Sequence, residues 1–107
     1  MGGEIKIASD KCWLASGWCY ATITDEIAAV LRETQTCPGL LEYLTDPAES
    51  PQVVSGVDLT SRPRNEQRAF HEAAVLALER LKQDPDFSAK HLERCQILID
   101  QLDGKLQ

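Results

Sequence analysis

The chain lacks any long apolar stretch, because its longest uninterrupted apolar run, residues 73–78, has only six members. A membrane-spanning helix needs about 20 such residues in a row. The first residues also lack the apolar core of a secretion signal, and Lys6 stands where an N-myristoylation signal requires serine or threonine. We therefore expect a cytoplasmic protein with no membrane partner.

Sequence signatures of catalysis are missing as well. The chain has no Gly-x-Ser-x-Gly turn, no glycine-rich phosphate loop and no His-Glu-x-x-His motif, since His71-Glu72 has no second histidine at the required spacing. The acidic pair Asp25-Glu26 is explained by a helix start, where the helix dipole favours negative charge. The sequence leans against an enzyme without deciding the question, and it predicts no catalytic residue and no cofactor.

The net charge of −6 is concentrated in the first 60 residues, which carry three basic and nine acidic side chains. An acidic surface repels phosphate backbones and anionic lipids, so nucleic acid is a disfavoured partner and a basic protein suits better. Residues 27–44 superficially resemble a helix-turn-helix. The second helix of that segment, however, contains no Arg, Lys, Asn or Gln that could reach base edges.

Two amphipathic helices form the clearest pattern in the chain. Residues 64–82 and 88–103 each place apolar side chains at helical spacing, and residues 83–87 separate them. Such a short break makes the two helices antiparallel neighbours. Ser88 is predicted to cap the second helix at its start, and Gly104 is predicted to end it.

Three apolar residues of this hairpin, Val75, Leu76 and Ile97, project away from the centres of the apolar stripes. The hairpin therefore needs cover on more than one side. Because monomers hide large apolar patches, either the N-terminal half or a partner must supply that cover.

The N-terminal half predicts short strands and short helices. Residues 4–8 alternate as in a strand, and residues 11–15 and 18–23 flank Ser16-Gly17 as in a β-hairpin. That hairpin would pair Leu14 with Cys19 and Trp13 with Tyr20, and it would place Trp13, Trp18 and Tyr20 on one face. The competing interpretation is a helix capped by Ser9.

Two helices should follow this hairpin. Thr24 is the expected cap of a helix that ends within residues 33–36, and Pro38 begins a second helix that ends near Thr45. Residues 46–62 read as a loop in which 53–54 and 57–59 form a short strand pair.

The pattern as a whole predicts one domain, residues 1–107, of the α+β class with helices dominant. Its parts are a β-hairpin with two short helices (1–45), a loop with short strands (46–62) and the αα-hairpin (63–103). An all-α four-helix bundle is the alternative fold.

The candidate ligands of a metal site are Cys12, Cys19, His91 and Cys95. His91 and Cys95 are four residues apart and share a helix face, but a tetrahedral zinc site needs four converging ligands. Cys12 and Cys19 do not have a standard ligand spacing, and burial in the apolar stripe explains Cys95. No metal is predicted, the cysteines are expected to be free thiols, and a metal- or thiol-dependent protein stays as the alternative function.

The leading hypothesis is a protein that acts by contact with another protein, as a regulator, adaptor, inhibitor or immunity-type protein. Surplus apolar surface and clustered aromatic side chains motivate it. Homodimerisation and a small-molecule-binding domain are further alternatives. The residues predicted to make the contacts are Trp13, Trp18, Tyr20, Arg64 and Arg68.

Overall fold

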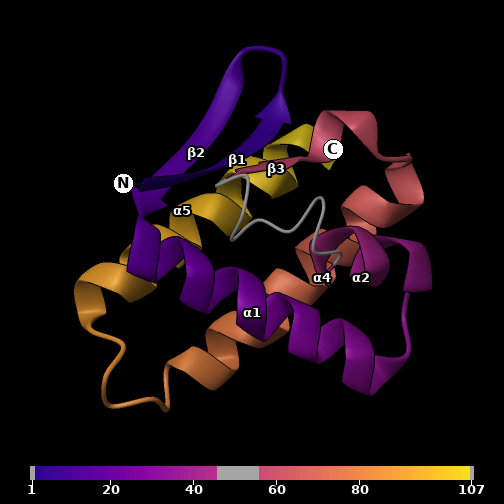
Figure 1. Cartoon of the computed structure of the whole chain (residues 1–107). Helices are drawn as coiled ribbons and strands as arrows, with labels where there is room; N and C mark the ends of the chain where they lie inside the picture. The colour runs from indigo at the N-terminus through magenta and orange to yellow at the C-terminus, as the bar shows by residue number, and fades with distance from the viewer. Residues whose placement is uncertain (1, 46–55, 107) are drawn as a thin grey trace.

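A computed structural model describes residues 2–45 and 56–106. It confirms an α-dominated α+β fold, with a small sheet packed on helices, and does not favour the four-helix bundle (Figure 1). The elements in chain order are β1 (Gly2–Ala8), β2 (Lys11–Ser16), α1 (Gly17–Thr34), α2 (Pro38–Thr45), β3 (Gly56–Asp58), the 3-10 turn η1 (Leu59–Ser61), α4 (Arg64–Leu81) and α5 (Ala89–Leu106).

The sheet has the strand order β2-β1-β3, so β1 is central. Ile5 of β1 lies between Trp13 of antiparallel β2 and Val57 of parallel β3, and all three side chains are buried. Their sequence neighbours are more exposed, as expected when successive strand residues point to opposite faces. One face of the sheet therefore packs against α1 and α5, and the other faces outward.

The predicted hairpin around Ser16-Gly17 is wrong. The strands turn at residues 9–10, so Trp13 pairs with Ile5 and Leu14 with Glu4, and Ser16 instead caps α1 by accepting the Cys19 N–H at 3.3 Å. A Ser-Gly pair suits a helix start as well as a turn, because a serine oxygen can accept from main-chain N–H groups in both. The alternative helix capped by Ser9 is also wrong, since β2 occupies that segment.

Thr24 does not cap a helix either. It is buried inside α1, and its hydroxyl donates to the Tyr20 carbonyl at 2.9 Å. The predicted end of this helix is confirmed, because α1 stops at Thr34 and Gln35 takes the left-handed conformation (φ 54°) that often terminates helices. The helix over residues 38–45 is confirmed with its predicted bounds.

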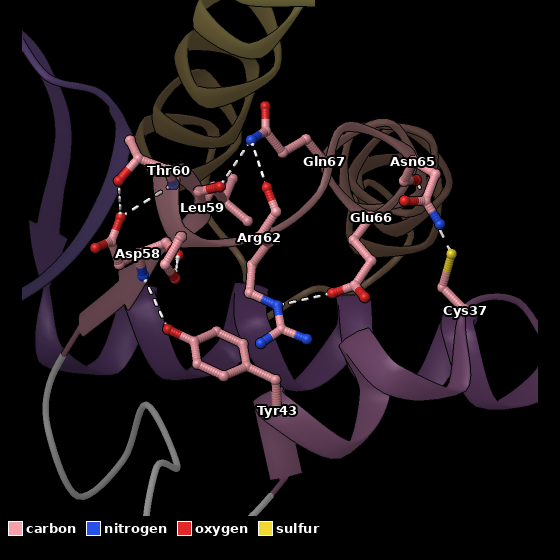
Figure 2. A network of polar contacts seen from close by, with 10 residues as sticks. Cys37, Tyr43, Asp58, Leu59, Thr60, Arg62, Asn65, Glu66 and Gln67 are labelled. Carbon is pink, nitrogen blue, oxygen red and sulfur yellow. Dashed lines mark hydrogen bonds and ion pairs between the residues drawn. The ribbon is translucent and has the colours of Figure 1, made fainter.

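The segment between β3 and α4 is held by side chains from two helices (Figure 2). The Tyr43 hydroxyl accepts the Asp58 N–H at 3.1 Å, and the Gln67 amide donates to the carbonyls of Leu59 (2.8 Å) and Arg62 (2.9 Å). Such contacts satisfy main-chain groups that regular structure does not pair. Of the strand pair predicted here, β3 exists and pairs with β1, and residues 53–54 lie outside the described residues.

The αα-hairpin is confirmed, with α4 and α5 packed together and joined by residues 82–88. The predicted stop at Gly104 is wrong, because α5 continues to Leu106. The Arg64 guanidinium donates to the Leu106 carbonyl at 2.9 Å and so satisfies a main-chain acceptor of the last turn. Within the predicted surplus surface, Ile97 is partly buried against the core, whereas Val75 and Leu76 are exposed.

Gly3 and Gly104 offer a matched test of the packing between the sheet and α1. A Cβ atom added at Gly3 would lie 2.0 Å from Cγ of buried Tyr20, whereas one added at Gly104 meets nothing within 4 Å. We expect Gly3→Ala to lower the free energy of unfolding by about 3 kcal/mol. Gly104→Ala should raise it by roughly 0.5–1 kcal/mol, because alanine is the better helix former.

Urea denaturation followed by circular dichroism measures both effects. An unchanged midpoint for Gly3→Ala would show that β1 does not pack on the Tyr20 ring.

Candidate interaction surfaces

Trp13 is a core residue with only 1% of its surface exposed, and it ties the sheet to α5. Its indole N–H donates to the Arg94 carbonyl at 2.8 Å. In return, the Arg94 guanidinium donates through Nε at 2.7 Å, and also through Nη2, to the carbonyl of Leu14. We call this exchange between Trp13, Leu14 and Arg94 the β2–α5 clamp.

Tyr20 is also buried, so the expected single face of Trp13, Trp18 and Tyr20 is wrong. The physical reason is that Trp13 lies on the inner face of β2, whereas Trp18 and Tyr20 lie on a helix and point in different directions. Burial raises the pKa of Tyr20, whose hydroxyl has no hydrogen-bond partner among the described residues. Of the three predicted aromatic contact residues, only Trp18 is available at the surface.

Trp18 lies in the first turn of α1 with 50% of its surface exposed. Its ring contacts His91 of α5 (centroids 4.9 Å apart) and Phe87 of the α4–α5 connection (5.8 Å), and Phe87 and His91 lie 5.4 Å from each other. Phe87 is buried, and His91 Nδ1 lies 2.9 Å from the Ser88 hydroxyl. The exposed indole therefore rests on a fixed base of two rings.

Arg94 follows His91 by one helical turn, so the side chains of both residues lie on the same side of α5. We call the surface formed by Trp18, His91 and Arg94 the Trp18 face. Exposed Leu14 lies on the outer face of the sheet, and Arg94 bonds to its main-chain carbonyl.

The sequence predicted Trp18 as a contact residue but gave no prediction for Phe87 and Arg94. Arg94 gives no local signal, because its partners lie 80 and 81 residues away in the chain. Phe87 could have been noticed as the one aromatic residue of the break between the two helices.

Arg64 and Arg68 lie on α4, near the C-terminal end of α1. They line a hollow of about 340 Å³ with Thr36, Cys37, Asn65, Ala69 and Glu72. Arg64 donates to the Leu106 carbonyl, whereas exposed Arg68 forms no hydrogen bond or ion pair within residues 2–45 and 56–106. A third arginine, Arg62, precedes α4. Its guanidinium carbon lies 4.7 Å from the centre of the Tyr43 ring, and its Nε pairs with Glu66 Oε1 at 2.7 Å. Figure 2 shows both partners.

The four candidate metal ligands are not brought together. In the described part of the chain, no three His, Cys, Asp or Glu side chains are placed to hold a metal ion. Cys12 is exposed on the outer sheet face, His91 belongs to the Trp18 face, and Cys19 and Cys95 are buried. Burial raises the pKa of both buried thiols, that of Cys95 to about 12, so they stay protonated at neutral pH.

Comparison of the chain with protein-family models, with curated proteins and with solved structures finds no match. Among the helices of the described residues, none is long and apolar enough to cross a membrane. The Trp18 face and the hollow lined by Arg64 and Arg68 are therefore the features that bear on function.

Because Cys19 and Cys95 are buried as protonated thiols, we expect the protein to lose stability at alkaline pH. A cysteine in the unfolded chain ionises near its ordinary pKa of 9.0, whereas folded Cys95 keeps its proton until about pH 12. Between pH 9 and about pH 12, ionisation of Cys95 thus favours the unfolded chain by about 1.4 kcal/mol per pH unit. Cys19 and Tyr20 act in the same direction, because their pKa values are also raised.

Urea denaturation between pH 8 and 11 measures this slope. Cys95→Ala should make the slope shallower, and the control Cys12→Ser, at an exposed thiol, should leave it unchanged. Equal slopes for the parent protein and Cys95→Ala would contradict the burial of a protonated thiol at this position.

Proposed function

We propose that this protein acts by binding another protein through the Trp18 face. The observation that carries the proposal is the half-exposed Trp18 indole resting on the Phe87 and His91 rings. Tryptophan is enriched among the residues that dominate binding energy, and a large exposed apolar ring gains most when a partner removes it from water.

The support under Trp18 favours binding, because the side chain is already held in place. A residue that loses little conformational freedom on association contributes more of its contact energy to affinity. His91, whose ring contacts the indole, and Arg94, one helical turn further along α5, supply polar groups at the edge of the face. This composition, an aromatic centre with a polar edge, is typical of protein–protein contact surfaces.

The net charge of −6 suggests the sign of the partner's charge. Long-range attraction speeds the encounter of oppositely charged proteins, so a basic protein is the partner class we propose.

All four cysteines are free thiols, which fits the reducing environment of the cytoplasm.

The test begins with a photo-crosslinking amino acid in place of Ala21, one helical turn after Trp18 on α1, so that the indole stays in place. The control is the same replacement at Leu76, an exposed apolar residue (48%) on α4, outside the Trp18 face. A protein crosslinked from position 21 and not from position 76 is then purified, and its affinity is measured by titration calorimetry.

Trp18→Ala should weaken that complex at least about 30-fold, by about 2 kcal/mol or more, because it removes the central aromatic contact. Leu76→Ala should leave the affinity unchanged. Unchanged affinity of Trp18→Ala, in a variant that denaturation shows to be folded, would contradict the proposed function.

A further inference from the structure

A groove runs between α1 and α4, on a different part of the molecule from the Trp18 face. It consists of three adjoining hollows of about 340, 130 and 450 Å³. The first and second hollows share Thr36, Ala69 and Glu72, and the second and third share Val30, Thr34 and Leu76. We call this continuous depression the α1–α4 groove.

The middle of the groove is mostly apolar. Buried Val30, Ala69 and Ala73 line it, and the two alanines are small enough to let a partner side chain approach closely. Leu76 lines the second and third hollows and is 48% exposed. Although α1 packs against α4, Leu76 stays exposed, and it is one of the residues that the sequence predicted to need cover.

The two ends of the groove differ in charge. In the third hollow, Arg80 is paired with Glu33 at 2.5 Å and Glu26 at 3.3 Å, and this contact holds the pKa of Glu33 below its ordinary value. Among the described residues that line the first hollow, Arg64 and Arg68 stand against one carboxylate, that of Glu72. The lining of this end of the groove thus carries a net positive charge.

We propose that the α1–α4 groove binds an amphipathic helix of a protein partner, with apolar side chains of successive turns in the three hollows. Acidic residues at the C-terminal end of that helix would meet Arg64 and Arg68, and the negative end of the helix dipole would add to the attraction. At about 1.5 Å per residue, α4 from Arg64 to Leu81 is roughly 26 Å long, enough for a helix of about four to five turns.

The charge also argues against a second copy of this chain as the occupant. Each copy carries a net charge of −6, so two copies repel each other at long range. A separate acidic-ended helix needs only to match the local positive end of the groove.

The experiment uses two synthetic 16-residue helical peptides with leucines along one face. One peptide ends in two aspartates at its C-terminus and the other in two lysines. Binding to ¹⁵N-labelled protein is followed by NMR and quantified by fluorescence anisotropy of labelled peptide. We expect the aspartate peptide to bind at least tenfold more tightly, with shifts in amides of α4 and the C-terminal half of α1.

Charge reversal provides the matched variants. Arg68→Glu should weaken the aspartate peptide and strengthen the lysine peptide, so that their order is reversed. Lys11→Glu makes the same change of charge at an exposed position on β2, outside the groove, and should leave the order unchanged.

Four results would overturn the proposal. The peptides could bind with equal affinity or not at all up to millimolar concentration, or their shifts could map to the Trp18 face. A concentration-dependent dimer that Leu76→Glu abolishes, seen by sedimentation, would assign the groove to a second copy instead. Because the Trp18 face is tested with its own variants, failure at one surface is distinguishable from failure at the other.

Discussion

The arrangement of the molecule depends on the β2–α5 clamp, in which Trp13 and Leu14 exchange hydrogen bonds with Arg94. The exchange joins segments at opposite ends of the chain and places the largest buried side chain, Trp13, between the sheet and α5. Arg94 also covers a carbonyl of β2, which is an edge strand, and an unpaired edge carbonyl would otherwise be open to pairing with other chains.

The clamp also sets the direction of α1, because β2 runs into that helix without a loop at Ser16. Once β2 is fixed on α5, the first turn of α1 must lie beside His91, and the Trp18 indole meets the His91 and Phe87 rings. The other end of α1 then borders α4 and forms the groove that ends at Arg64 and Arg68. Both proposed binding surfaces are thus consequences of how one helix is held at its start.

Local sequence patterns predicted the helical elements whose own side chains decide their structure. The α2 helix and the αα-hairpin follow from Pro38, from apolar spacing and from the break before Ser88. The position of the first turn did not follow, because Ser16-Gly17 fits both a hairpin and a helix start, and packing decides between them. Trp18 and the arginine pair were predicted as contact residues. The core positions of Trp13 and Tyr20 depend on contacts across about 80 residues and on Gly3, which local patterns do not contain.

The central claim is that the two tryptophans have opposite roles, with Trp13 held in the clamp and Trp18 presented to solvent. Hydrogen exchange of the two indole N–H groups, followed by ¹⁵N NMR and assigned with Trp18→Phe, tests this claim most directly. We expect the Trp13 indole proton to exchange only with global unfolding, because the Trp13 ring is buried and its N–H donates to the Arg94 carbonyl. The Trp18 indole proton should exchange within the dead time. Fast exchange of the Trp13 indole proton, or equal protection of both, would contradict it.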